Sequence, residues 1–274
     1  MFIDQLAHNC LQEGVRLSGA TAKIFAHNDP QQLERLLRTE RERDARKSIF
    51  VILESLYSMD SDSPDLIAIM PMMRKYGAIT ILDVAHDFGC LGVTGLGLLD
   101  TLPVDLRPDV IMGSFSKTFA SNGGFVCCNE AVSDYLQCFS SPFVFSNAIS
   151  PVQSAVVKKA LEIVFSPEGA KLRQALMDRI LAFRAKAADL GLTVRGTPSA
   201  ICPVFVGPEA LARATSRYIE ELGLLANLVE FPAVPKGEAR FRFQLMSTHS
   251  FDAIDRALDI LVEARDRARL VLPQ

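Results

Sequence analysis

Two short apolar runs that end in polar residues decide the fold: Ala78-Ile79-Thr80-Ile81-Leu82-Asp83-Val84-Ala85-His86 and Val110-Ile111-Met112-Gly113-Ser114-Phe115-Ser116-Lys117-Thr118. Both runs have the length and apolar character of buried strands. Parallel strands end at one edge of a sheet, where open α/β sheets bind ligands, so Asp83 and Lys117 are expected at the same edge. An acid and a lysine at such an edge are the protein's half of a pyridoxal phosphate site. The lysine forms the Schiff base, and the acid keeps the pyridine nitrogen protonated so that the ring acts as an electron sink.

The composition indicates a globular enzyme. The chain has 274 residues, of which 49% are hydrophobic, and a net charge of −3, which suits one large α/β domain and a smaller one. Charge this near neutral argues against nucleic-acid binding. With no signal peptide and no apolar run of about 20 residues, we expect a cytoplasmic protein without a transmembrane segment. The six cysteines lack metal-site or redox spacing, so we expect reduced, mostly buried thiols and no metal.

Strand-like runs alternate with helical patterns over the first part of the chain, which is typical of a mostly parallel sheet. A long helical stretch then leads to a small α/β unit. We therefore expect a large domain at 1–170 and a small C-terminal domain at 171–274. The expected strands are 2–4, 22–25, 48–54, 78–83, 110–112, 123–128, 200–206, 224–230 and 239–246. The expected helices are 31–38, 64–76 with a kink at Pro71, 151–165, 167–191, 209–222 and 251–269. The charged run 39–47 reads as a solvated helix end and loop.

Three other motifs have weaker interpretations. The glycines at 92, 95 and 97 do not match the dinucleotide-binding fingerprint in order or spacing. The stretch from Gly113 to Thr118 is not a nucleotide phosphate loop, because Ser116 stands where that motif needs glycine. His86 has no third metal ligand spaced near it. A single lysine or aspartate after a strand is usually only a surface residue or a helix cap, so the combination carries the argument.

Seven segments together identify a family pattern. With them the chain resembles the α-oxoamine synthases, a branch of the fold-type I pyridoxal phosphate enzymes that includes glycine C-acetyltransferase, 8-amino-7-oxononanoate synthase, serine palmitoyltransferase and 5-aminolevulinate synthase. The segments, in the family's order, are Asp4-Gln5-Leu6-Ala7-His8, His27-Asn28-Asp29, Glu54-Ser55-Leu56-Tyr57-Ser58-Met59-Asp60, Asp83-Val84-Ala85-His86, Gly113-Ser114-Phe115-Ser116-Lys117, Phe145-Ser146 with Pro151, and Ala239-Arg240-Phe241-Arg242 followed by His249.

The resemblance assigns roles to residues of this chain. It implies that Lys117 binds the cofactor aldehyde and Asp83 pairs with the pyridine nitrogen. It places His86 near the cofactor's phenolic oxygen, His8 on the ring face and Ser58 against a cofactor oxygen.

The remaining roles concern the cofactor phosphate and the substrate. Ser114 matches the phosphate-contacting hydroxyl, and Ser146 and Asn147 fall where a partner subunit usually contributes a phosphate contact. Arg242 matches the arginine that binds the substrate carboxylate.

The resemblance implies a fold-type I transferase with an N-terminally truncated large domain and a homodimeric assembly. The implied reaction condenses an amino acid with an acyl-CoA, with loss of carbon dioxide, to an α-amino ketone. Lys117 would act as the general base. A non-catalytic partner subunit and a fold-type I aminotransferase stay open as alternatives.

Two departures from the family pattern stand out. Val84 replaces an acidic residue that is not essential. Family members are also longer, and the resemblance places the missing N-terminal third before Met1, including a glycine-containing turn that donates backbone N–H groups to the cofactor phosphate.

Overall fold

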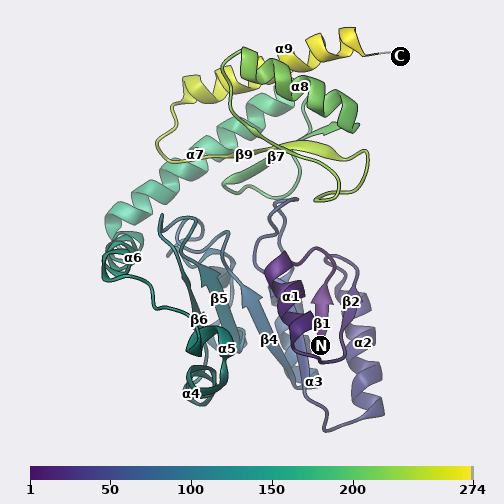
Figure 1. Ribbon diagram of the computed structural model, residues 1–274, viewed down its shortest axis with the longest axis vertical. Coiled ribbons are helices and arrows are strands. Elements are labelled where there is room, and N and C mark those ends of the chain that lie inside the picture. Colours follow the sequence, from purple (N-terminus) through teal and green to yellow (C-terminus); the bar gives the residue numbers. More distant parts are fainter. Residues whose placement is uncertain (273–274) are drawn as a thin grey trace. The chain divides into compact units, whose positions relative to one another are not determined.

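The computed structural model describes residues 1–272, which divide into two compact units. The first unit comprises residues 1–57 and 63–170. The second comprises the described residues from 171 to 272 together with the short segment 58–62, which follows a strand of the first unit (Figure 1). Segment 58–62 therefore belongs, by its contacts, to a part of the chain more than 100 residues away.

A six-stranded sheet forms the centre of the first unit, in the order β2-β1-β3-β4-β5-β6. Its strands up to β5 pair in parallel, and β6 is antiparallel to β5. The mostly parallel sheet expected from the sequence is confirmed. The strands are β1 (Phe2–Asp4), β2 (Lys23–Phe25), β3 (Ile49–Glu54), β4 (Ala78–Asp83), β5 (Val110–Ser114) and β6 (Gly124–Cys127).

Alternating side chains of the strands pack against helices on the two faces of this sheet. On one face, Leu53 and Leu82 pack in a core with Leu33 of α2 and Met70 of α3. On the other face, Ile3 and Ile52 pack with Leu11 and Val15 of α1. The helical elements of this unit are α1 (Asn9–Leu17), α2 (Pro30–Arg43), α3 (Leu66–Tyr76), η1 (Gly97–Thr101), η2 (Val104–Leu106), α4 (Glu130–Phe139), α5 (Ser141–Val144) and α6 (Pro151–Val164).

Two helix expectations need correction. Helix α2 continues to Arg43, and Glu40 within the charged run is 5% exposed and forms ion pairs of 2.7 Å with Lys23 and Lys47. That part of the run is buried because both ammonium groups neutralise the carboxylate. Helix α3 begins at Leu66, since the side chain of Asp65 accepts a hydrogen bond from the Ala68 N–H and caps the helix.

The expectation of mostly buried thiols is wrong. All six cysteines are free, but only Cys202 is buried, and Cys10, Cys127 and Cys138 are exposed. These three residues lie on α1, β6 and α4, at positions that face the surface. The number of cysteines in the sequence therefore does not predict how many are buried.

The second unit is a three-stranded antiparallel sheet with helices. The sheet order is β7-β9-β8, so β9 lies in the middle and pairs with both neighbours. Phe241 and Leu258 are fully buried in its core. Its elements are β7 (Ile201–Gly207), α8 (Glu209–Glu221), β8 (Asn227–Val229), β9 (Ala239–Gln244), α9 (Phe251–Val271) and all but the first four residues of α7 (Pro167–Asp189). Within residues 1–272, no helix is both long and apolar enough to span a membrane.

Candidate active site

The carboxyl ends of β4 and β5 form one edge of the site. Asp83, the last residue of β4, lies opposite Met112 in the parallel pairing with β5. Its side chain is 6% exposed, and the Ala85 N–H donates to its Oδ1 at 2.8 Å. Among residues 1–272 no other hydrogen bond reaches this carboxylate, so Oδ2 is available to a ligand. Burial raises the pKa of Asp83, while the Ala85 N–H and the charge of Lys117 lower it.

Lys117 reaches the same edge from the loop after β5. Its Nζ lies 3.1 Å from Nε2 of His86, which follows β4 by three residues. The Lys117 side chain is exposed and so accessible to an incoming molecule. The turn before it is fixed by Ser114, whose Oγ accepts the Ser116 N–H at 3.1 Å and lies 2.7 Å from the Ser116 hydroxyl.

Aromatic side chains support the Lys117 loop from within the first unit. Phe115 and Phe119 flank the loop, are buried, and meet edge to face at 5.6 Å. Phe125 of β6 packs on Phe115 at 5.5 Å and lies so close to Gly113 that a Cβ there would come within 2.7 Å of its ring. Glycine at position 113 therefore lets the ring pack directly on β5.

Glu54 and His8 extend the site to β3 and the start of α1. Glu54, the last residue of β3, pairs in register with Asp83 and is 2% exposed. Its Oε1 accepts a short hydrogen bond from the backbone N–H of His8. His8 is exposed and caps α1 by accepting the Cys10 N–H at its Nδ1. Burial raises the pKa of Glu54 to about 8, with Asp83 adding to the rise and Lys117 opposing it.

A buried network behind His8 fixes the ends of β1 and β2. Asp4 is 1% exposed and accepts hydrogen bonds from the Leu6 N–H at 2.8 Å and the Asn28 N–H at 3.0 Å. His27 Nδ1 lies 2.7 Å from Asp4 Oδ1, and the ring of Tyr57 meets the His27 ring edge to face at 4.5 Å. The sequence places both polar segments in the family pattern, but it does not reveal that they share one carboxylate.

In the second unit, two arginines of β9 bind segment 58–62. Arg242 donates from Nε to the Ser58 carbonyl at 2.8 Å. Arg240, 1% exposed, forms ion pairs with Asp60 at 2.5 Å and with Glu238 at 3.1 Å. Residues 240 and 242 alternate along one strand and so share a face. Arg240 has no assigned role in the sequence analysis, although its spacing from Arg242 signals this shared face.

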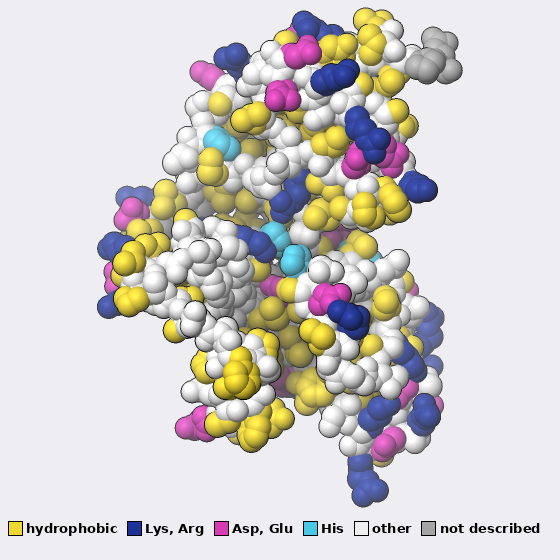
Figure 2. Space-filling view, in the orientation of Figure 1, with side chains coloured by type: hydrophobic (Ala, Val, Ile, Leu, Met, Phe, Trp, Pro, Cys, Tyr) yellow, Lys and Arg dark blue, Asp and Glu magenta, His cyan; other side chains and the backbone are white. Residues whose placement is uncertain are grey.

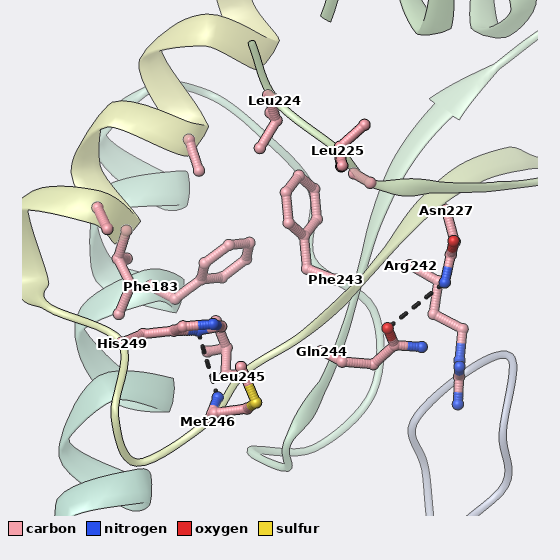
Figure 3. Close-up of a pocket in the computed structure, with 14 residues that line it drawn as sticks. Phe183, Leu224, Leu225, Asn227, Arg242, Phe243, Gln244, Leu245, Met246 and His249 are labelled. Carbon is pink, nitrogen blue, oxygen red and sulfur yellow. Dashed lines mark hydrogen bonds between the residues drawn. The ribbon is translucent and has the colours of Figure 1, made fainter. Parts of the chain in front are cut away.

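Arg242 also borders a cavity of about 710 Å³ within the second unit (Figure 3). Most of its lining is apolar, including Phe183, Leu245 and Ile254. His249 contributes a polar group, since its Nδ1 accepts the Met246 N–H at 3.3 Å.

Comparison with known proteins places this site in a family. The family model described as aminotransferase class I and II matches residues 1–261. The 8-amino-7-oxononanoate synthase of Citrifermentans bemidjiense is 32% identical over 271 residues, which cover 99% of this chain and 69% of that enzyme. The chain belongs to the aminotransferase class I and II family. Within it, the chain is an α-oxoamine synthase homologue, as the sequence predicts.

Other relatives of this α-oxoamine synthase homologue agree. The 8-amino-7-oxononanoate synthase of Klebsiella pneumoniae strain 342 is 37% identical over 94% of this chain and 66% of its own length. Human serine palmitoyltransferase 3 is 32% identical over 97% of this chain and 50% of its own. The chain thus spans about two thirds or less of most of these relatives. A solved Sphingomonas wittichii serine palmitoyltransferase superimposes with a TM-score of 0.91 at 26% identity, which confirms the fold-type I architecture.

The α-oxoamine synthase pattern predicts site residues that fall in three places. Lys117, His86, Asp83, Ser114 and His8 lie at the carboxyl edge of the first unit's sheet. Ser58 and Arg242 contact each other within the second unit. Ser146 and Asn147 lie exposed in the segment between α5 and α6.

Proposed function

We propose that this chain carries the pyridoxal phosphate chemistry of an α-oxoamine synthase, which condenses an amino acid with an acyl-CoA and releases carbon dioxide to give an α-amino ketone. The observation that carries the proposal is the pairing of Lys117 with His86 at 3.1 Å, beside the buried carboxylate of Asp83. Similarity to 8-amino-7-oxononanoate synthases and serine palmitoyltransferases supports this reaction class.

The donor set fits the cofactor. Asp83 keeps Oδ2 free of hydrogen bonds from residues 1–272, and a buried carboxylate is the partner that a protonated pyridine nitrogen requires. Lys117 presents an exposed amine 34 positions later, at the same edge of the sheet. When bound, pyridoxal phosphate supplies an electron sink for the electrons released at the substrate's α-carbon.

Lys117, His86 and Asp83 have different roles in this proposal. Lys117 would provide the amine that holds the cofactor aldehyde, and the same amine would serve as the general base for the α-proton of the substrate. His86 holds the amine by a hydrogen bond and orients it. A cation that faces Asp83 would favour its ionised form and so oppose the effect of burial, which raises its pKa.

The remaining predicted residues are assigned within this proposal. Ser58 and His8 contact the cofactor, Ser114 its phosphate, and Ser146 and Asn147 the phosphate of a partner subunit's site. Arg242 binds the substrate carboxylate, since Nε is bound to Ser58 while the fork of its terminal nitrogens suits a carboxylate.

The proposal includes a cytoplasmic homodimer. Hydrophobic side chains gather over α4 and α5 (Figure 2). Phe139, Phe143 and Phe145 are 70%, 62% and 86% exposed. Exposed apolar patches of this kind commonly mark protein interfaces, and sedimentation of the purified chain tests the assembly.

The function is tested on the purified chain in two stages. Pyridoxal phosphate is expected to produce a visible absorption band that Lys117→Ala abolishes and that the control Lys171→Ala, an exposed lysine on α7, preserves. CoA-thiol release is then measured from a panel of acyl-CoAs with glycine, alanine or serine. Absence of the band in the unmodified chain would favour the non-catalytic alternative, and transamination of a keto acid without thiol release would favour the aminotransferase.

A further inference from the structure

Glu54 has no role in the proposed chemistry, yet it is an almost fully buried acid at this edge of the sheet. It lies directly opposite Asp83 on the adjacent parallel strand, so the two side chains point to the same face. Both are buried, at 2% and 6% exposure. A buried carboxyl group needs a hydrogen-bond partner to offset its desolvation.

The partner of Glu54 is the backbone of His8, 46 residues earlier in the chain. We propose that Glu54 is a positioning residue, which holds His8 and the first turn of α1 against the sheet edge where Asp83 lies. This inference deepens the proposed function and rests on it. Glu54 acts through His8, whose N–H would otherwise be one of the unpaired donors at a helix N-terminus.

The carboxyl groups of Glu54 and Asp83 lie opposite each other, and Glu54 can hold His8 without being ionised. Two carboxylates on one face of a sheet repel each other strongly in a buried setting, so one of the pair keeps a proton. Glu54 keeps it, because burial raises its pKa to about 8, and a neutral carboxyl oxygen still accepts the His8 N–H. A neutral Glu54 adds no negative charge beside Asp83, which favours ionisation of Asp83. The titratable groups acting on Glu54 or on its neighbours are Asp83, Asp4, Lys117, Tyr57, His8 and Cys10.

Cys10 offers a reporter of this contact that needs no cofactor. Its Sγ lies 3.0 Å from Nδ1 of His8, and its thiol is exposed. Burial raises the pKa of Cys10 most, and the charges of Asp83 and Glu54 raise it further. Cys138 on α4 is also an exposed free thiol and serves as an internal reference.

The experiment compares Glu54→Leu with Glu54→Gln in the cofactor-free chain. Leu removes the acceptor at similar size, whereas Gln retains a carbonyl oxygen that can accept the His8 N–H. Iodoacetamide alkylation of Cys10, normalised to Cys138 by peptide mass spectrometry at pH 7, is expected to rise roughly fivefold in Glu54→Leu, the factor that corresponds to one lost hydrogen bond. Pyridoxal phosphate affinity, followed by the visible band, is expected to fall by a similar factor. Glu54→Gln should stay within about twofold of the unmodified chain in both measurements.

The outcomes separate this proposal from the proposed function. If the unmodified chain forms no visible band, the proposed function fails, while the Cys10 rates still test the contact. Unchanged Cys10 alkylation in folded Glu54→Leu, or equal losses in Leu and Gln, overturns the positioning role.

If Glu54→Leu does not fold, a second comparison uses only the unmodified chain and Glu54→Gln. At pH 9 the unmodified chain carries a charged Glu54 that holds back ionisation of the thiol, so Glu54→Gln should alkylate Cys10 roughly twofold faster. Identical rates at pH 9 place Glu54 away from the His8 turn and overturn the proposal.

Discussion

Nζ of Lys117 lies 3.1 Å from Nε2 of His86, although 31 positions separate the two residues in the chain. The parallel pairing of β4 with β5 brings them together, because both residues follow strands that end at one edge of the sheet. An imidazole at this distance can fix the position of the amine and exchange a proton with it.

Substitution of His86 by alanine is expected to reduce turnover by about 10² to 10³-fold, because the amine of Lys117 loses its hydrogen-bonding partner and proton relay. The visible band should persist, since Lys117 and Asp83 are unchanged. Thiol release under saturating substrate measures turnover, with Lys171→Ala as the handling control. Turnover within a factor of two of the unmodified chain would remove His86 from the catalytic machinery.

Asp83→Asn is expected to abolish measurable turnover while leaving the fold intact, because a neutral amide cannot keep the pyridine nitrogen protonated. In the unmodified chain burial raises the pKa of Asp83, so turnover should fall as pH decreases through that pKa and the carboxylate takes up a proton. A pH profile of thiol release measures this acidic limb. Asp83→Asn with near-normal turnover contradicts the assigned role.

The sequence predicts that Asp83 and Lys117 reach one edge of the sheet, because this arrangement is encoded locally. An apolar run that ends in Asp83 and another that leads to Lys117 define strand, edge and side chain together. Contacts between distant segments are not encoded in this way. Segment 58–62 joins the second unit through Arg240 and Arg242, about 180 positions later.

Burial of charged residues is the other feature that local sequence does not reveal. Glu40 lies in a run of charges that reads as solvated, but Lys23 and Lys47 reach it from outside α2 and neutralise it. Glu54 likewise looks like any acid at a strand end. Its burial depends on the strand pairing with β4 and on the His8 turn that covers it.

Glu54 gives the folded chain a pH-dependent stability. Its pKa is about 8 in the folded state, above the ordinary value of 4.5 expected when the chain is unfolded. Its contribution is therefore fully present below about pH 4.5 and is lost as pH rises through 8. Between pH 6 and pH 8 we expect this group to lower the free energy of unfolding by about 2 kcal/mol.

Urea unfolding of the cofactor-free chain at these two pH values measures the effect. Glu54→Gln should remove most of the slope, because an amide does not titrate. Asp87 contributes a smaller part of the slope, because burial raises its pKa only to about 6, which corresponds to about 0.4 kcal/mol between pH 6 and pH 8. An unchanged slope in Glu54→Gln assigns the pH dependence to another group.

Arg240 is expected to be a main stabilising residue of the second unit. It is 1% exposed, and its guanidinium binds Asp60 and Glu238 together with the Met59 carbonyl at 3.2 Å. Arg240→Met leaves these acceptors without their buried cation, so we expect a loss of about 3 kcal/mol in the free energy of unfolding. Urea unfolding measures this loss.

Arg213→Met is the matched control, because Arg213 makes an ion pair with Glu230 at 2.8 Å in an exposed position on α8. Exposed pairs of this kind contribute little to stability. Equal losses in the two variants would show that burial does not set the importance of Arg240.

The role proposed for Arg242 concerns substrate binding and not stability. Its Nε donates a hydrogen bond to the Ser58 carbonyl at 2.8 Å, and its terminal nitrogens donate no hydrogen bond to any acceptor among residues 1–272. Arg242→Ala is therefore expected to weaken amino-acid binding by about tenfold or more while the visible band of the bound cofactor remains. Arg242→Lys should recover only part of the affinity, because an ammonium group cannot form the paired hydrogen bonds of a guanidinium. Amino-acid titration followed by the change in the band measures both, and a titration that Arg242→Ala leaves unchanged would exclude this arginine from the substrate site.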